Sequence, residues 1–386
     1  ETNNVDCYAL EYFCNGDAKL KAAMDTIVKE MHDAKEYGSI LNITPVDFTA
    51  LYARFDEVRD DISMSKENVL NSLLPLVQVA EALAQKYDVV VTNPPYMAVA
   101  FGSPKMYDFI KRYYQDSKTD LFAVFIERCR IFTKENGFQG MITMHAWMFL
   151  SSYEKLRMKI LASDVVNMVH LGARAFEEIA GEVVQTTSFI FRKSNCKDYK
   201  STYCRLTSVS TAKEKEDAYR SGENKYFSKN SAYQNIPGSP VAYWLSLHIV
   251  QSFLTVDRLG VISKRRQGMA TTNNNRFLRL WYEVEHDNIG FDLNSIEDTI
   301  CEEKWYPYNK GGDFRKWYGN NDYVVNFKNK GKEVCSYIDA TSAVNSKGRV
   351  INREHYFHEC ISWSLVSSGN IAFRYKQNGF IFDVAG

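Results

Sequence analysis

Hydrophobic and polar residues along the chain form stretches with two different periods. Apolar side chains recur at helical spacing from Ala18 to Glu36 and again from Val69 to Leu83, which predicts amphipathic helices. A strand-like segment occupies 40–43, and short apolar runs predict further strands at 88–91, 140–144, 165–171 and 187–191. The run at 88–91 is β-branched, which is typical of a buried strand in a parallel sheet, and 187–191 is expected to be the antiparallel neighbour of 165–171 at a sheet edge. This alternation predicts an α/β fold.

The pattern weakens in the middle of the chain. Residues 194–235 are rich in Lys, Ser, Asn and Glu, which predicts a linker or excursion between two globular parts at 1–193 and 236–386. A turn-rich start at Ile236 and an aromatic helix near Trp244 predict the beginning of the second part.

Composition limits the kinds of function. The chain has 386 residues, 47 basic and 47 acidic side chains and a net charge of zero, so any nucleic-acid surface must come from local basic patches. The eight cysteines show no CxxC pairing, so we predict no metal site and expect reduced thiols in a cytoplasmic protein. Apolar runs long enough for a membrane span and a signal peptide are both absent from the sequence.

The strand at 88–91 ends abruptly in Asn93-Pro94-Pro95-Tyr96. Two prolines prevent continuation of strand or helix, so we expect a rigid loop at the carboxyl end of a strand, where open α/β sheets bind ligands. An amide carbonyl, fixed backbone carbonyls and an aromatic face suit a flipped-out nucleobase that carries an exocyclic amine. After this loop, the irregular stretch at 98–111 predicts a mobile loop over the site.

The Asn93–Tyr96 motif after a hydrophobic strand resembles the catalytic motif of amino-group methyltransferases that use S-adenosylmethionine. The resemblance implies that the Asn93 side chain and the Pro94 carbonyl accept hydrogen bonds from the target amine, which frees its lone pair for methyl transfer. It also implies that Tyr96 stacks on the base, that Pro95 completes the motif, and that Asn93 borders the cofactor.

The same resemblance suggests roles for three more residues. Asp47 and Phe48 match an Asp-Phe pair that holds the cofactor's adenine, although an ordinary helix N-cap at Asp47 explains the sequence nearly as well. Tyr153 matches an aromatic that stacks on the base opposite Tyr96, with simple packing as the alternative. We interpret Asp120 as a helix cap and His170 as a packing or hydrogen-bonding residue.

Two turn-rich segments in the second half, 264–277 and 304–318, interleave cations, amides and aromatics. Such side chains can contact phosphates and base edges, although solvated loops are the alternative. The candidate DNA-binding residues are Lys264, Arg265, Arg266, Asn274, Arg276, Lys304, Lys310, Arg315 and Lys316. The segments resemble the target-recognition region of adenine-specific methyltransferases of the BREX phage-exclusion type, except that Thr272 and Asn273 stand where that family has Gly and Asp.

The resembled family has a glycine-rich cofactor loop that does not appear ahead of Asn93, so the chain looks like a fragment that binds cofactor weakly and is inactive alone. The expected fold is therefore a partial Rossmann-like methyltransferase sheet that lacks its first strands, followed by a mixed α+β DNA target-recognition domain. The expected function is methylation of the exocyclic amine of adenine in duplex DNA by base flipping, in phage defence or restriction-modification, with other defence subunits as further partners. A DNA-recognition subunit without catalysis and a protein-glutamine methyltransferase remain as alternatives.

Overall fold

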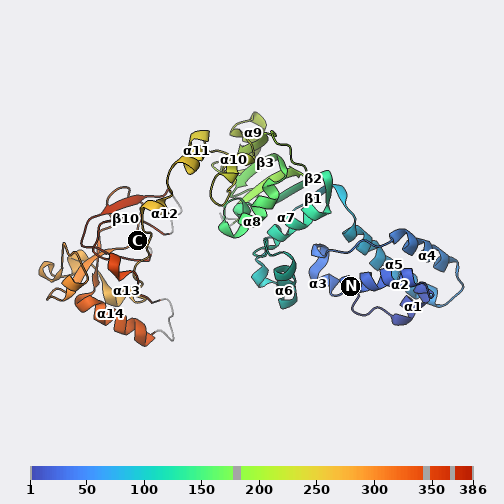
Figure 1. Cartoon of the computed structure of the whole chain (residues 1–386), viewed down its shortest axis with the longest axis horizontal. Coiled ribbons are helices and arrows are strands. Elements are labelled where there is room, and N and C mark those ends of the chain that lie inside the picture. The colour runs from blue at the N-terminus through green and yellow to red at the C-terminus, as the bar shows by residue number, and fades with distance from the viewer. Residues whose placement is uncertain (1, 177–183, 342–347, 366–369, 385–386) are drawn as a thin grey trace. The chain divides into compact units, whose positions relative to one another are not determined.

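The computed structural model describes residues 2–176, 184–341, 348–365 and 370–384 (Figure 1). The chain divides into two compact units, Glu1–Val256 and Asp257–Gly386. Each unit has its own hydrophobic core, and we describe each by itself.

The first unit begins with helices that share one core, and the helical spacing predicted α2 and α5 among them. These helices are α1 (Cys7–Cys14), α2 (Ala18–Glu30), α3 (Ala34–Tyr37), α4 (Phe48–Asp60) and α5 (Ser65–Ala84). The strand expected at 40–43 is absent, because a 3-10 turn, η1 (Gly38–Ile40), leads into extended chain without a strand partner.

A six-stranded sheet follows, in the order β1-β2-β4-β3-β5-β6. Its strands are β1 (Tyr87–Thr92), β2 (Thr133–Met144), β3 (Asp164–Gly172), β4 (Thr186–Arg192), β5 (Ser201–Arg205) and β6 (Lys225–Ser228). The other elements of this unit are η2 (Val99–Phe101), α6 (Pro104–Tyr113), α7 (Leu121–Phe132), η3 (His145–Met148), η4 (Ser151–Tyr153), α8 (Glu154–Leu161), α9 (Ala212–Ser221), α10 (Ser231–Gln234) and α11 (Leu247–Thr255).

The β1–α7–β2 crossover confirms the predicted α/β class, because β1 pairs with β2 in parallel. Two details differ from the sequence expectation. β4 is antiparallel to β3 as expected but lies inside the sheet, between β2 and β3. Residues 194–235 are not a linker, since β5 pairs with β3 and β6 pairs with β5.

β1 lies in a parallel pair, as expected, but it is not buried, contrary to expectation. It stands at the end of the strand order, and Val89 and Val91 are 59% and 75% exposed. Val90 points to the other face, where it packs against the core that α7 and α8 form with the sheet. The exposed face continues onto Phe138 of β2 and Ile190 of β4. This face of the mixed sheet is therefore exposed over β1, β2 and β4.

The second unit is a mixed α+β domain, as predicted. Its four-stranded sheet has the order β12-β8-β9-β7, and a two-stranded sheet pairs β10 with β11. The strands are β7 (Leu278–Leu280), β8 (Trp305–Asn309), β9 (Tyr323–Asn326), β10 (Cys360–Trp363), β11 (Phe373–Lys376) and β12 (Ile381–Phe382). The helices and 3-10 turns are α12 (Leu259–Ile262), α13 (Asn274–Phe277), η5 (Trp281–Glu283), η6 (His286–Asn288), η7 (Glu297–Thr299), α14 (Lys328–Thr341) and η8 (Arg353–His355).

Arg128 of α7 joins the helical region to the sheet. Its guanidinium is buried, and it donates to the carbonyl oxygens of Ser39 and Leu83 and to the side-chain oxygen of Asn42 at 2.9–3.0 Å. The same group lies 3.8 Å from the ring centroid of Phe132. One buried side chain therefore satisfies acceptors from two separate segments, the stretch 39–42 and the end of α5.

We expect Arg128→Met to lower the free energy of unfolding by about 3 kcal/mol, because it leaves several buried acceptors without a donor. Arg59→Met is the matched control, since Arg59 is exposed on α4 and its loss should change stability by no more than about 0.5 kcal/mol. Urea denaturation followed by circular dichroism compares the two variants, and equal midpoints would contradict the structural role of Arg128.

Candidate functional site

The proline corner, Asn93–Tyr96, follows β1 directly. Thr92 pairs with Met141, so the corner leaves the sheet at the edge where the carboxyl ends of β1 and β2 meet. Asn93 and Pro95 are exposed, whereas Pro94 is buried. The corner thus presents an amide side chain to solvent on a backbone that two proline rings restrict.

Tyr96 fixes the Asn93 side chain in place. Its hydroxyl oxygen lies 3.0 Å from Asn93 Oδ1 and 3.2 Å from the carbonyl oxygen of Ile142 on β2. Because a hydroxyl has one proton, it can donate to only one of these acceptors at a time. Burial raises the pKa of Tyr96 to about 12, so this group remains a neutral donor near neutral pH.

The chain that leaves the corner is pinned to the start of α7. The backbone N–H of Leu121 donates to the carbonyl of Met97 at 3.0 Å. The Asp120 carboxylate accepts from the N–H groups of Met97 and Phe122, each at 3.2 Å. The expected capping role of Asp120 is confirmed, and burial raises the pKa of this carboxyl group. Asp120 therefore holds both the helix and the exit of the corner.

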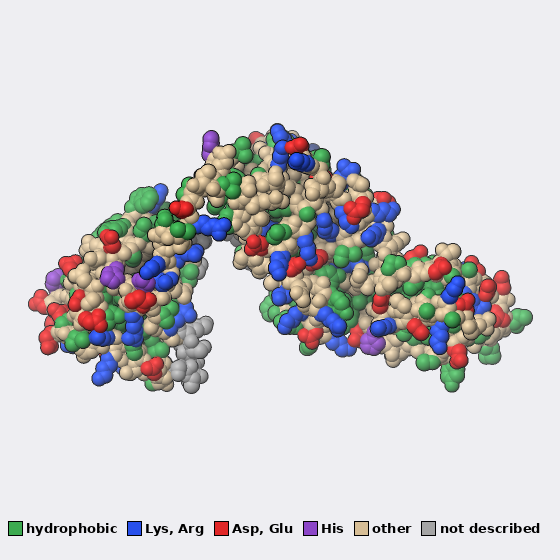
Figure 2. All heavy atoms as spheres, in the orientation of Figure 1, with side chains coloured by type: hydrophobic (Ala, Val, Ile, Leu, Met, Phe, Trp, Pro, Cys, Tyr) green, Lys and Arg blue, Asp and Glu red, His purple; other side chains and the backbone are tan. Residues whose placement is uncertain are grey.

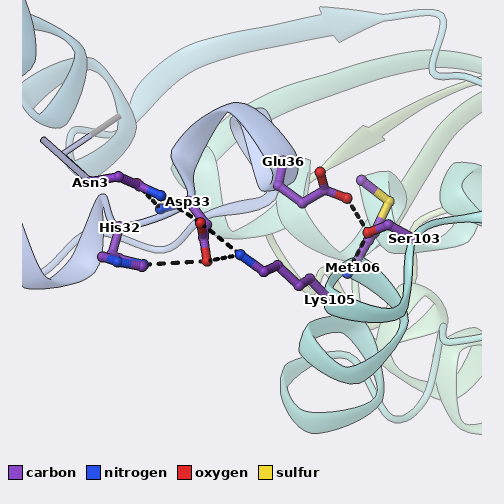
Figure 3. Close-up of polar contacts among 7 residues, drawn as sticks. All are labelled: Asn3, His32, Asp33, Glu36, Ser103, Lys105 and Met106. Carbon is purple, nitrogen blue, oxygen red and sulfur yellow. Dashed lines mark hydrogen bonds and ion pairs between the residues drawn. The ribbon is translucent and has the colours of Figure 1, made fainter.

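The stretch predicted to be a mobile loop is instead a helix held against the helical region. Ser103 caps α6 by accepting from Met106 N–H at 3.1 Å, and it also donates to Glu36 (Figure 3). Lys105 forms an ion pair with Asp33 at 3.0 Å (Figure 3). The hydrogen bonds from Asn3 and, to a smaller extent, Lys105 lower the pKa of Asp33, which keeps this carboxylate charged.

The second predicted stacking residue, Tyr153, does not face Tyr96. Tyr153 is only 4% exposed and lies within the sheet core. Phe122 contacts both rings, with centroids 6.4 Å from Tyr96 and 5.8 Å from Tyr153. A base could reach Tyr153 only if the core opened, whereas Tyr96 is half-buried at the surface. The structure thus favours the packing alternative for Tyr153.

Asp47 and Phe48 lie on a different part of the first unit. The Asp47 carboxylate caps α4 by accepting from Ala50 N–H at 3.0 Å, which is the helix-cap alternative. Phe48 packs against the helical core, while Tyr96 packs against the sheet core. The two residues therefore do not join Asn93 in one cluster.

The sequence did not reveal a buried row of hydrogen-bonding side chains that begins at His145. His145 follows β2, and its Nδ1 lies 2.7 Å from Nε2 of His170. The other ring nitrogen of His170 lies 3.2 Å from the Tyr243 hydroxyl. Burial, with a smaller effect from His145, lowers the pKa of His170 to about 3, so both rings are neutral near pH 7. The expected packing and hydrogen-bonding role of His170 is confirmed.

In the second unit, two of the predicted cations meet in one groove. Arg276 and Lys304 line a groove of about 660 Å³ together with Lys328 and Lys332, which we call the basic groove. Glu333 is the carboxylate among its lining residues, and it forms an ion pair with Arg276 at 3.0 Å. That hydrogen bond lowers the pKa of Glu333. The groove therefore has a local excess of positive charge.

The other candidate DNA-binding residues do not line this groove. Lys264, Arg265, Arg315 and Lys316 are exposed. Arg266 donates to His355, Asn274 accepts from the Thr271 hydroxyl, and Lys310 lies 3.6 Å from Asp383. Each of the two predicted segments thus contributes one cation to the basic groove.

Sequence reasoning missed Lys328 and Lys332, although the run Lys328-Asn329-Lys330-Gly331-Lys332 is visibly basic. Figure 2 shows acidic and basic side chains mixed over the visible face, in agreement with the zero net charge. Within the described part of the chain, His, Cys, Asp and Glu side chains do not gather in groups of three that could hold a metal ion. The described helices include none that is both long and apolar enough to cross a membrane.

Comparison with known proteins adds sequence relatives. Residues 19–176 match the family model of the Eco57I restriction-modification methylase. The adenine-specific methyltransferase PglX of Lacticaseibacillus casei is 44% identical over 81% of this chain, and the adenine-specific methyltransferase BrxX of Escherichia coli is 35% identical over 96% of it. The matches cover 26% and 30% of those relatives, so the chain spans under a third of their length.

Among solved structures, the chain is similar to the Type IIL restriction-modification enzyme MmeI in complex with DNA. The match has a TM-score of 0.45 and 13% identity, and it covers 79% of this chain and 40% of that one.

Proposed function

We propose that this chain, which is 44% and 35% identical to the adenine-specific methyltransferases PglX and BrxX over most of its length, methylates the exocyclic amine of adenine in duplex DNA. The observation that carries this proposal is the exposed Asn93 amide on the proline corner at the carboxyl edge of the sheet. S-adenosylmethionine is the proposed methyl donor. The proposed setting is phage defence or restriction-modification in the cytoplasm, with other defence subunits as further partners.

The proline corner supplies hydrogen-bond acceptors to the amine. Asn93 Oδ1 and the Pro94 carbonyl oxygen accept one hydrogen each, so that the nitrogen lone pair points away from both oxygens. Asn93 Oδ1 is free for this role when the Tyr96 hydroxyl donates to Ile142 instead. The two alternative partners of Tyr96 thus allow the corner to exchange an internal hydrogen bond for one to the base.

The same acceptors stabilise the transition state. Positive charge would grow on the amine nitrogen during methyl transfer, until that nitrogen releases a proton to solvent, and the two carbonyl dipoles would stabilise the charge. To reach the corner, the adenine must leave the duplex, and stacking on one aromatic side chain contributes about 1–3 kcal/mol toward this step. Tyr96 is better placed than Tyr153 to provide that face, because Tyr153 is buried.

The cofactor site is only partly present in the described residues. When bound, S-adenosylmethionine supplies an electrophilic methyl group. Asn93 would border the cofactor, because its side chain is exposed at the carboxyl edge of the sheet. Asp47 and Phe48 do not fit as they stand, since one caps α4 and the other packs in the helical core. We therefore assign the cofactor's adenine end to no residue of this chain.

The second unit is proposed to hold the DNA. Its basic groove and the exposed cations Lys264, Arg265, Arg315 and Lys316 are suited to phosphate contacts, which position a protein on DNA without reading sequence. A recognition subunit without catalysis would need the same cations but not the Asn93 corner. Calorimetric titration of the full-length protein with S-adenosylmethionine separates the two functions, because only the enzyme should bind it tightly and saturably.

We expect Asn93→Ala to lower the rate of methyl transfer by about 100-fold or more in the full-length protein, because one acceptor for the developing charge is lost. Transfer of a tritiated methyl group to duplex DNA measures the rate, and a gel-shift titration measures DNA affinity, which should change less than about threefold since the contact forms fully only in the transition state. Asn68→Ala on α5 is the matched control. A loss of DNA affinity as large as the loss of rate would contradict the assigned role.

We also expect Lys332→Ala to reduce the salt dependence of DNA binding. Each phosphate contact adds about 0.9 to the slope of log affinity against log salt concentration, so the slope should fall by about that amount. Lys213→Ala is the matched control, because Lys213 is an exposed lysine on α9 that pairs with Asp217. Fluorescence anisotropy at several salt concentrations gives both slopes, and an unchanged slope for Lys332→Ala would exclude the basic groove as a phosphate site.

A further inference from the structure

The second unit contains a second concave site, which we call the aromatic pocket. It has a volume of about 350 Å³, within the range of small-molecule sites. Its lining includes six aromatic side chains: Trp281, Phe291, Tyr318, Tyr323, Tyr375 and Phe380. Trp281 and Tyr318 are 51% and 74% exposed. Clustered exposed aromatic rings in a concave site mark a surface that binds a ligand.

The polar groups of the aromatic pocket are mostly neutral. Three amide side chains, those of Asn321, Gln377 and Asn378, line it. An amide offers both hydrogen-bond donors and acceptors, which is the pairing that the edge of a nucleobase requires. The Tyr375 hydroxyl donates to Glu359 at 2.8 Å, which orients the Tyr375 ring.

A buried cation among the lining residues limits the charge of the ligand. Lys376 is only 2% exposed, and its ammonium group donates to the carbonyls of Gly319 and Asn320 and to the side chain of Asn321. Burial lowers its pKa to about 8, so the group is still mainly charged at pH 7. Aromatic cages often bind quaternary ammonium groups. Here the charge of Lys376 opposes a cationic ligand, and the carboxylate of Asp292 in the lining partly offsets that charge.

We propose that the aromatic pocket binds a nucleobase, a neutral planar heterocycle that stacks on the exposed rings and hydrogen-bonds to the amides. The base could come from a free nucleoside or from an unpaired position in a nucleic-acid strand, since both present the same chemistry. The pocket lies wholly within residues 281–380, and the inference does not depend on methyl transfer at Asn93.

Two probes distinguish the sources of the base. The complete 386-residue chain is titrated with adenosine, followed by calorimetry, and with a single-stranded oligonucleotide that contains 2-aminopurine, followed by fluorescence. We expect saturable binding of at least one probe. Binding of adenosine identifies a free nucleoside site, and binding of the oligonucleotide alone identifies a site for a strand base.

Variants then locate the binding. Trp281→Ala and Tyr318→Ala should each weaken it roughly tenfold or more, the usual effect of losing one stacking ring, whereas Tyr318→Phe should bind like the wild type. Tyr282→Ala is the matched control, because Tyr282 is 65% exposed beside Trp281 but does not line the pocket. Its affinity should change less than about twofold.

Three results would overturn the proposal. The first is that neither probe binds. The second is that Trp281→Ala and Tyr318→Ala bind like the wild type although circular dichroism shows them to be folded. The third is that tetramethylammonium competes with the base. Trp281→Ala and Tyr318→Ala report on the aromatic pocket through binding of the probes, whereas Asn93→Ala reports on the methyl-transfer site through the rate of methyl transfer, so failure of the two sites is distinguishable.

Discussion

The parallel pairing of β1 with β2 is the constraint on which the candidate site depends. With Thr92 opposite Met141, the chain leaves β1 beside the carboxyl end of β2, and Tyr96 reaches the Ile142 carbonyl, one residue further along. The prolines restrict the backbone of the corner, but its contacts with the neighbouring strand and with the Asp120 cap fix its position. A one-residue slip in this register would move the Ile142 acceptor away from Tyr96 and release Asn93 with it.

The second unit shows how a chain of zero net charge can carry sites of distinct chemistry. The basic groove concentrates Arg276, Lys304 and two further lysines around one paired carboxylate. The aromatic pocket, by contrast, combines exposed rings with amides above a lysine whose donors are already used. One site suits phosphates and the other suits bases, so the two together supply the chemistry that a nucleic-acid surface requires.

Local features of the sequence were sufficient to predict the proline corner and the Asp120 cap, because both depend on backbone restrictions within a few residues. Long-range pairing was not visible in the same way. Residues 194–235 have weak periodicity, yet β5 pairs with residues of β3 that lie 35 positions earlier, and so joins the sheet.

Burial was equally hard to predict. A β-branched run is typical of a buried strand, but Val89 and Val91 are exposed because β1 ends the strand order and their face of the sheet is open. Tyr153 was predicted to stack on the base, but its ring is buried in the sheet core and contacts Phe122. The basic groove arises where α13, β8 and α14 approach one another, so no single stretch of sequence revealed all four cations.

The most direct test of the central claim is a crystal structure of the full-length protein with duplex DNA and an unreactive analogue of S-adenosylmethionine. The account predicts an everted adenine whose amine nitrogen lies about 2.7–3.2 Å from both Asn93 Oδ1 and the Pro94 carbonyl oxygen. An everted adenine whose amine is held by other residues, with Asn93 still bonded to Tyr96, would contradict it.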